Sequence, residues 1–290
     1  MGRYGPTHEE FDYSPTTVRR SVERSLKRLN TTYLDTVFLH DIDFVCTPIY
    51  PRETSTGDHS TSLSDGTLAE EWGLAEHQAS LIRGPGDQKV LDAYAELAKL
   101  KEEGIIKSIG ISGYALPALL RIAILVLNTA PYQPLDIVMS FSHSNLQNAV
   151  FYDFLPAFKG RARIPRVLTA SPLNMGLLTP SPPSWHPAPS AMVDLTKQII
   201  QMDQVQQRPG GLPNVALGYA FRRAEGGGEE GSIPTVVGLS TLKEVHECVA
   251  VWREVVGGSG NQEERKSIEE VVRSSYRNAG WADYSWKCGF

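Results

Sequence analysis

The stretch Thr36-Val37-Phe38-Leu39-His40-Asp41-Ile42-Asp43 decides the fold of this chain. It opens with β-branched and large apolar residues and then changes abruptly to a histidine followed by acidic residues. An apolar run of this kind is typical of a strand buried in a parallel sheet. In α/β barrels the residues that follow such strands gather at one end, where the chemistry takes place. The stretch therefore predicts a strand over Asp35–Leu39 that delivers His40 to the mouth of an α/β barrel.

Strand-like and helix-like segments alternate along most of the 290 residues. The first helix is predicted to begin at Ser14-Pro15, where Ser14 can cap it and Pro15 fits the first turn, and to end at Asn30. Such alternation indicates βαβ units and a parallel sheet, an α/β fold. Strands are expected over 35–39, 105–112, 135–140, 165–170 and 233–237, and helices over 15–29, 90–100, 116–127, 149–158, 191–206, 215–224, 242–256 and 262–277.

One long segment, Cys46 to Gln88, interrupts this alternation. It is rich in Ser, Thr, Gly, Pro and acidic residues, and a loop of this length inside a compact domain is either functional or disordered. We expect an insertion over the barrel mouth after the first strand, partly disordered, with a helical turn near Leu68–Leu81. Gly226 to Gly231 is predicted to be a flexible acidic loop. The rest of residues 1–290 is expected to form one domain, with residues 257–290 as its C-terminal helix and tail.

Composition excludes several classes of function. The formal net charge is −5, so a nucleic-acid partner is not expected. Met1-Gly2-Arg3-Tyr4 lacks an apolar signal core, and the apolar run Leu116–Leu127 is too short to span a membrane. Cys46, Cys248 and Cys288 lack metal-ligand spacing, as do the histidines, so no metal site is expected. These features predict a cytoplasmic protein with reduced thiols.

Small polar residues recur where the predicted strands end. Serines and glycines let backbone N–H groups and hydroxyls come close to a phosphate or an amide, and a helix N-terminus favours an anion. Each serine could instead be only a helix cap, and His40 could be a neutral histidine bonded inside the core. The recurrence favours a ligand site more than any single member does. The residues are His40, Ser112-Gly113, Ser140, Ser142, Ser171-Pro172-Leu173 and Gly238-Leu239-Ser240-Thr241.

These segments together resemble the aldo-keto reductases, and within them the L-galactose dehydrogenase and NAD-dependent D-arabinose 1-dehydrogenase branch. The resemblance runs in order from about Gly2 to Trp252 and is carried by residues 21–29, 33–41, 103–114, 142–148, 170–178 and 237–245. It implies a (β/α)8 barrel of the TIM type that binds NAD or NADP at its mouth, and a tetrad of tyrosine, lysine, aspartate and histidine. His40 matches the catalytic histidine that orients the substrate carbonyl.

The resemblance also implies a set of cofactor-binding residues. Ser112 matches the serine that contacts the nicotinamide carboxamide, and Ser140, at the next strand end, is assigned to the same site. Ser171, Leu173 and Gly176 match the pyrophosphate loop, whereas Gly238, Ser240 and Thr241 match the site for the adenosine end.

This sequence departs from the family pattern at several places. Gly113 stands where an asparagine is usual, and Ala170 where a tyrosine often stacks on the nicotinamide. The Lys-Ser and arginine pattern of NADP-selective members is not evident near Leu239–Val245, which favours NAD. Gly2–Gly5 resembles the segment just after the catalytic lysine. We therefore expect an N-terminally truncated barrel with about five of eight strands, without the catalytic tyrosine, lysine and aspartate; Tyr4 is not expected to replace them.

Two functions remain open at this point. The chain is expected to be a truncated, catalytically incomplete oxidoreductase that oxidises an aldose such as D-arabinose or L-galactose to its lactone. The alternative is a non-catalytic cofactor-binding or interaction protein, a pseudoenzyme derived from the same family. The expected partners are a small sugar or carbonyl substrate and, through the open barrel edges, a second copy of the chain, with neither nucleic acid nor membrane.

Overall fold

The structure is a computed structural model that describes residues 1–5, 7–49, 56–225, 232–258 and 260–286. It contains two compact units. The first unit consists of Met1–Ser140 and Asp153–Val167, and the second of Phe141–Tyr152 and Leu168–Trp286. Each unit is described by itself below.

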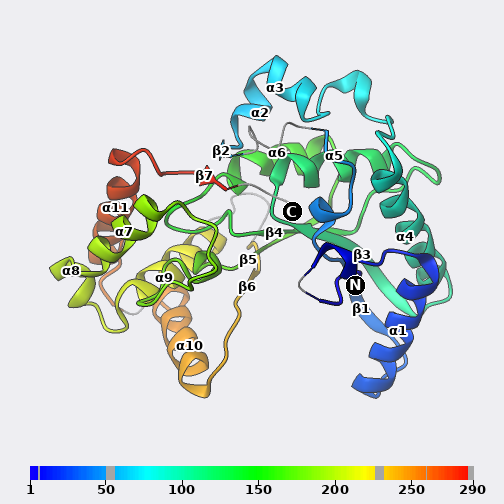
Figure 1. Cartoon of the computed structure of the whole chain (residues 1–290). Helices are drawn as coiled ribbons and strands as arrows, with labels where there is room; N and C mark the ends of the chain where they lie inside the picture. The colour runs from blue at the N-terminus through cyan, green and yellow to red at the C-terminus, as the bar shows by residue number, and fades with distance from the viewer. Residues whose placement is uncertain (6, 50–55, 226–231, 259, 287–290) are drawn as a thin grey trace. The chain divides into compact units, whose positions relative to one another are not determined.

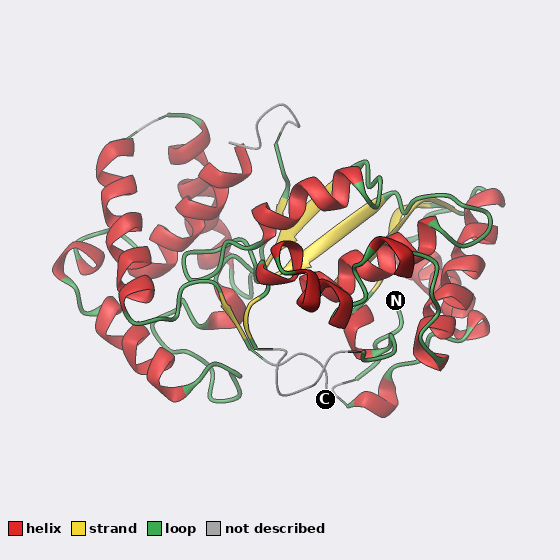
Figure 2. Cartoon of the chain, turned by 90° about the horizontal axis from the view of Figure 1, so that it is seen from above, coloured by secondary structure: helices red, strands yellow, loops and turns green. Residues whose placement is uncertain are grey.

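Parallel strands form the centre of the first unit. β1 (Leu34–Leu39) pairs with β3 (Ile106–Gly113), and β3 pairs with β4 (Ile137–Phe141), whose last residue belongs to the second unit. Leu39 lies opposite Ile111, and Gly113 opposite Ser140, so these strands end along one edge. Figures 1 and 2 show these strands from two directions. The three strands are those that the sequence predicts, which confirms the parallel arrangement there.

Three long helices belong to the first unit. α4 (Pro85–Glu102) packs against β1 and β3, α1 (Pro15–Leu29) packs against α4, and α5 (Leu116–Leu127) packs against β3. α1 ends as predicted, because Asn30 adopts the left-handed conformation with φ of 51°. The predicted cap at its start is wrong: the Ser14 side chain makes no capping bond, and the Ser14 N–H instead donates to Asp12 Oδ1 at 2.8 Å.

The inserted segment contains more regular structure than predicted. Residues 50–55 lie outside the described residues. Beyond them come β2 (Gly57–Asp58), α2 (Thr61–Ser64), α3 (Gly66–Glu71) and the 3-10 turn η4 (Glu76–Gln78), and α4 already begins at Pro85. The helical turn expected near Leu68–Leu81 is confirmed by α3 and η4, and the regular structure around it goes beyond the prediction. A capping residue such as Asp65, which accepts the N–H groups of Thr67 and Leu68, starts a short helix without any long apolar period.

A buried ion pair ties this segment to α5. Both terminal nitrogens of Arg121 donate to Asp87, at 2.7 and 2.9 Å, and Asp87 also accepts the N–H groups of Thr47 and Arg83. The side chain of Asp87 is fully buried and that of Arg121 is 6% exposed. This contact explains why an arginine interrupts an otherwise apolar helix, since its charge is matched by a carboxylate from a distant part of the chain.

The first unit also contains two short turns and a segment that runs beside β1. The turns are η1 (His8–Glu10) and η2 (Ile42–Phe44). The Met1 nitrogen donates to the Phe38 carbonyl, and the His40 N–H donates to the Met1 carbonyl at 2.8 Å. Part of the edge of β1 that was expected to be open is therefore hydrogen-bonded by the chain itself.

The second unit is mainly helical. β5 (Arg166–Ala170), which begins in the first unit, pairs in parallel with β6 (Thr235–Val236). α9 (Gly211–Glu225) contacts four other helices and is central to this unit. Those four helices are α7 (Ser190–Ile200), α8 (Asp203–Gln206), α10 (Leu242–Val256) and α11 (Gln262–Asn278). The unit also contains η5 (Asn174–Gly176) and β7 (Tyr284–Ser285). α6 (Phe151–Gly160) has residues in both units.

Most of the elements predicted in the second unit are confirmed, but one predicted helix is divided into two. The helix expected over 191–206 is two helices, because Met202 adopts an extended backbone with ψ of 131° between them. The prediction for Gly226 to Gly231 falls outside the described residues. Among the helices of the described chain, none combines the length and the apolar character needed to cross a membrane.

Candidate functional site

His40 follows β1 and has two contacts that fix it. Its Nδ1 lies 3.1 Å from Asp41 Oδ2, and its carbonyl accepts the hydroxyl of Tyr13 at 2.7 Å. The side chain is 47% exposed, so the alternative of a histidine bonded inside the core does not describe it. Because Asp41 holds Nδ1, the other ring nitrogen, Nε2, is the one placed to meet a ligand.

The pKa values of the two acidic residues after His40 are shifted in opposite directions. Burial works toward a higher pKa of Asp41, but the bonds and charges of His40 and Arg3 outweigh it and lower that pKa. Burial and the charge of Asp41 raise the pKa of Asp43 to about 6. Asp43 Oδ2 accepts the N–H groups of Tyr114 and Ala115, both at 3.3 Å, just before α5. Asp43 therefore links the end of β1 to the turn that follows β3.

This link explains the glycine that replaces the usual asparagine. A Cβ added to Gly113 would lie 2.4 Å from Asp43 Oδ1. Any side chain at position 113 would collide with the buried carboxyl of Asp43 unless that carboxyl or the backbone shifted. Asp43 and Gly113 are thus a matched pair, which the sequence does not reveal because the two residues are 70 positions apart.

Ser112 and Ser140 are each the last residue but one of β3 and β4, and their hydroxyls are buried. Ser112 is 3% exposed and Ser140 is 1% exposed, and neither hydroxyl has a hydrogen-bond partner among the described residues. Asp43 Oδ1 is in the same condition. A buried polar atom without a partner is costly and calls for an explanation, such as a ligand or an ordered water. We name His40, Asp43, Ser112 and Ser140 the strand-end group.

Tyr13, the tyrosine bonded to the His40 carbonyl, is not poised to exchange a proton. Burial, followed by the charges of Asp41 and Asp43, raises the pKa of Tyr13 well above its usual value, and its hydroxyl is used on the His40 carbonyl. Tyr13 therefore does not have the setting of an activated acid–base group. Tyr4 is 40% exposed, and its ring faces Arg24.

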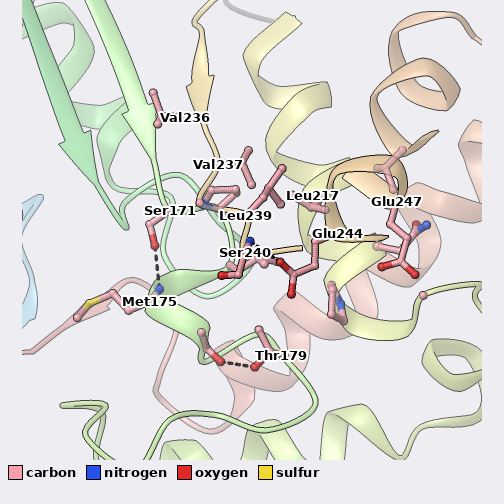
Figure 3. A pocket seen from close by; sticks show the side chains of 18 of the residues that line it. Ser171, Met175, Thr179, Leu217, Val236, Val237, Leu239, Ser240, Glu244 and Glu247 are labelled. Atoms are coloured by element: carbon pink, nitrogen blue, oxygen red, sulfur yellow. Dashed lines mark hydrogen bonds between the residues drawn. The ribbon is translucent and has the colours of Figure 1, made fainter. Parts of the chain in front are cut away.

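The second unit contains a cavity of about 890 Å³. Its walls come from the loop after β5, the residues after β6, the start of α9 and the first turns of α10 (Figure 3). We name it the α10 cavity. Five of the predicted cofactor residues line it, namely Ser171, Leu173, Gly176, Gly238 and Ser240.

The loop after β5 is held in a tight shape by its own hydroxyl. Ser171 Oγ accepts the N–H of Met175 at 2.9 Å (Figure 3). Ser171, Met175 and Gly176 all have positive φ, of 60°, 57° and 94°. Such a backbone turns sharply and leaves main-chain groups on the cavity wall. The Ser171 hydroxyl, predicted as a ligand contact, is thus engaged in shaping the loop.

The start of α10 is a closed capping box. Glu244 Oε2 accepts the N–H group of Ser240 at 2.6 Å (Figure 3). It also accepts the N–H group of Thr241 at 3.0 Å, and Thr241 Oγ1 accepts the Glu244 N–H at 3.2 Å. Thr241 is therefore a helix cap, and it is not among the residues that line the cavity. This outcome corresponds to the alternative that the sequence left open for such residues.

Three charged residues of the α10 cavity were not predicted as site residues. Lys243, Glu244 and Glu247 all lie on α10 and line the cavity. The spacing of Thr241 and Glu244 is the signature of a capping box, which would have indicated Glu244 at the start of this helix. Nothing in the sequence indicates that these side chains face a cavity. Among the described residues, no group of three or more His, Cys, Asp or Glu could hold a metal ion.

Comparison with known proteins places the chain in a family. The model of the aldo/keto reductase family matches residues 3–271. The chain belongs to the aldo/keto reductase family. L-galactose dehydrogenase from Arabidopsis thaliana is 30% identical over 281 residues, which is 97% of this chain and 70% of the relative. D-arabinose 1-dehydrogenase from Saccharomyces cerevisiae is 29% identical over 290 residues, covering 97% of this chain and 72% of the relative.

Solved structures of the family share the fold. A glycerol dehydrogenase from Gluconobacter oxydans has a TM-score of 0.50 at 17% identity, and the match covers 95% of this chain and 71% of the other. An aldo-keto reductase from Bacillus halodurans has a TM-score of 0.51 at 18% identity, covering 90% of this chain and 68% of the other. The recognition of the family from sequence is confirmed.

Proposed function

We propose that this aldo/keto reductase is an NAD(P)-dependent oxidoreductase that oxidises an aldose, such as D-arabinose or L-galactose, to its lactone. The observation that carries the proposal is the α10 cavity, formed where the sequence predicted the cofactor loops. The names of the two sugar dehydrogenases that the chain resembles support the class of substrate. When bound, the nicotinamide ring of the cofactor supplies the hydride acceptor.

The residues of the α10 cavity fit the adenosine and pyrophosphate part of a dinucleotide. Its volume of about 890 Å³ lies in the range of small-molecule sites. Leu173 and Leu239 offer apolar surface to a base, and the backbone around Ser171 and Gly176 offers polar groups at close range. We assign the adenosine end to the start of α10 and the pyrophosphate to the loop after β5.

The strand-end group of the first unit, considered by itself, offers a hydroxyl and an imidazole that are suited to a polar ligand. The unpartnered hydroxyl of Ser112 is a group that a carboxamide could satisfy, which would remove the cost of leaving it unbonded. Ser112 lies opposite Met139 and Ser140 lies opposite Gly113, so the two hydroxyls project from opposite faces of the sheet, and Ser140 is not placed to share that ligand. His40 Nε2 would orient the substrate oxygen, accepting from a sugar hydroxyl when the ring is neutral. The catalytic role of His40 and the cofactor contact of Ser112 are proposals that rest on the resemblance and on this fit.

The alternative function is a non-catalytic protein that still binds the cofactor. It is favoured by the state of Tyr13, the tyrosine beside His40, whose hydroxyl is bonded to a carbonyl and whose pKa is raised. Self-association through strand edges and a cytoplasmic location stay predictions. If this alternative holds, purified Met1–Phe290 is expected to bind the cofactor and to oxidise no aldose above background.

The test measures binding and turnover on the same preparation. Nucleotide fluorescence reports NADH and NADPH binding to purified Met1–Phe290, and absorbance at the reduced nicotinamide band reports oxidation of D-arabinose and L-galactose. The variants are His40→Ala, Ser112→Ala and, as a control in the first unit, His77→Ala, whose side chain is 69% exposed. Ser112→Ala is expected to weaken binding by about fivefold, the loss of one neutral hydrogen bond.

Each outcome separates the two functions. Binding with turnover that is lost in His40→Ala and kept in His77→Ala would establish the dehydrogenase and contradict the non-catalytic alternative. Binding without turnover would support the non-catalytic protein. Failure to bind either nucleotide would contradict both functions and the assignment of the α10 cavity.

A further inference from the structure

The His40 ring is held by the carboxylate of the next residue in the chain. Asp41 Oδ2 lies 3.1 Å from His40 Nδ1, and Arg3 Nη1 donates to the same oxygen at 2.7 Å. In an extended strand, neighbouring side chains point to opposite faces. Asp41 reaches its neighbour because its backbone is left-handed, with φ of 59° and ψ of 56°. Such a backbone is uncommon outside glycine and clusters at functional sites, so the contact is built into the turn after β1.

Asp41 decides which nitrogen of the ring carries the proton. Its side chain is 13% exposed; burial works toward a higher pKa of Asp41, but the bonds and charges of His40 and Arg3 lower it on balance. Asp41 is therefore ionised at neutral pH and can only accept a hydrogen bond. A neutral imidazole has one N–H group, and this contact requires it at Nδ1. The lone pair of the neutral ring is then on Nε2.

The rest of His40 is fixed, and Nε2 is the nitrogen that a ligand can reach. The His40 carbonyl accepts the Tyr13 hydroxyl at 2.7 Å, and the His40 N–H donates to the Met1 carbonyl at 2.8 Å. The side chain is 47% exposed. A histidine with a fixed backbone, a fixed tautomer and a basic second nitrogen has the setting of a proton acceptor, and its carboxylate partner stabilises the imidazolium that forms.

We propose that His40 is the proton acceptor of the oxidation and that Asp41 is the positioning residue that fixes its tautomer. The inference rests on the proposed function and goes beyond it, because there His40 only orients the substrate. When the sugar is oxidised, the C–H bond of the anomeric carbon breaks, and the hydride passes to the oxidised nicotinamide dinucleotide. The O–H bond of the anomeric hydroxyl breaks, its proton passes to His40 Nε2, and the C=O bond of the lactone forms. The half-exposed ring then releases the proton to water.

The chain offers variants that separate charge, side chain and backbone. Asp41→Asn removes the charge and keeps a residue that tolerates the left-handed backbone, whereas Asp41→Gly removes the side chain and keeps that backbone without strain. His40→Gln has an amide that can hold the substrate oxygen but cannot take up a proton. The matched control is Asp35→Asn at the other end of β1, where the carboxylate is 76% exposed and pairs with Lys107.

The first measurement reads the tautomer without any nucleotide. Nitrogen-15 NMR of the full chain with labelled histidine is expected to show the proton of neutral His40 on Nδ1, and the same in Asp35→Asn. Asp41→Gly is expected to move it to Nε2, the more stable form of an imidazole side chain that has no partner. The signal that disappears in His40→Gln identifies His40. A neutral ring with its proton on Nε2 in the full chain would overturn the inference.

The second measurement compares kcat and KM for the oxidation of D-arabinose and L-galactose. Loss of general base catalysis in His40→Gln is expected to lower kcat by about 10²–10⁴-fold. Asp41→Asn is expected to lower kcat by at least about tenfold and to change KM little, since the lost interaction is strongest when the ring becomes charged. Asp35→Asn is expected to keep both constants.

The results distinguish this inference from the proposed function. Turnover that Asp41→Asn leaves unchanged, or that His40→Gln retains, would overturn the inference and leave the dehydrogenase standing. Absence of turnover by the full chain would overturn the dehydrogenase, and this inference with it, whatever the tautomer. Thermal unfolding of each variant confirms that a lower kcat does not come from a damaged fold.

Discussion

The strand-end group and the α10 cavity place polar residues in opposite ways. In the strand-end group of the first unit, the polar side chains of Asp43, Ser112 and Ser140 are buried, and each leaves an atom without a partner among the described residues. In the α10 cavity the polar groups bond to one another, as Ser171 does to Met175 and Glu244 to Ser240. The strand-end group presents side-chain atoms, whereas the α10 cavity presents backbone that is held in shape by side-chain hydrogen bonds.

The difference indicates how each region could recognise a ligand. Unpartnered buried atoms gain a hydrogen bond when a ligand supplies one, so the strand-end group is suited to a group of matching polarity. In the α10 cavity the backbone groups already have hydrogen-bond partners, so this cavity would recognise a ligand by its shape and charge instead. We therefore expect substitutions in the first unit to have large effects on stability, and substitutions at the α10 cavity to have small effects on stability and larger effects on selectivity.

The largest effect is expected for the buried ion pair of the first unit. Asp87→Ala leaves the buried Arg121 guanidinium without its partner, and should lower the free energy of unfolding by about 3–5 kcal/mol. Denaturant unfolding measures this change. Asp92→Ala removes an exposed carboxylate from the same helix and should cost less than about 0.5 kcal/mol. Equal effects of the two substitutions would show that the first unit does not depend on buried side-chain partners.

A pH dependence of intermediate size is expected from Asp43. The folded state raises the pKa of this carboxyl from 3.8 to about 6, so it favours the protonated form. Its contribution to stability is therefore full below pH of about 4 and is lost as the pH rises through about 6. The difference in unfolding free energy between the full chain and Asp43→Asn should fall by about 2–3 kcal/mol from pH 4 to pH 7.

This comparison uses Asn because its amide oxygen can still accept from Tyr114 and Ala115 but does not titrate. Measuring the difference between the two proteins removes the contribution of the other carboxyls. A difference that stays constant across this pH range would contradict the raised pKa of the buried Asp43 carboxyl.

The smallest effect is expected for the cap of α10. Thr241→Ala removes the hydroxyl that accepts the Glu244 N–H and should cost about 1 kcal/mol, while Thr241→Ser should keep most of the stability. Chemical denaturation of both variants measures this. A cost for Thr241→Ala as large as that for Asp87→Ala would remove the contrast between the two regions. Equal losses for Ala and Ser would show that the threonine methyl group, rather than the cap, matters.

Local sequence patterns predict the elements of this protein well. α5 and α10 have the predicted bounds, and β1 and β5 differ from theirs by one residue at the start, because apolar periodicity and end signals act within a few residues. The insertion is the main exception. Its short helices depend on caps such as Asp65 and on the contact between Asp87 and Arg121, which joins residues 34 positions apart.

The candidate site is predicted only in part for the same reason. Recurrent serines and glycines after strands indicate the residues near the ligand, and five of them do line the α10 cavity. The hydroxyl of Ser171 is bonded to the loop after β5 and that of Thr241 caps α10, and such local hydrogen bonds compete with a ligand for the same hydroxyl. The charge of the cavity wall, set by Glu244 and Glu247, requires knowing which face of α10 is turned inward.

The sequence by itself determined the family, the alternation of strands and helices, and the position of His40 directly after β1. These follow from patterns that each segment carries within itself. Only the tertiary structure decided that Asp43 is buried against Gly113, that Ser112 and Ser140 keep unpartnered hydroxyls, and that Glu244 closes the start of α10. The physical reason is that burial, pKa and charge at a site depend on which residues come into contact, and most of these contacts join residues that are far apart in the sequence.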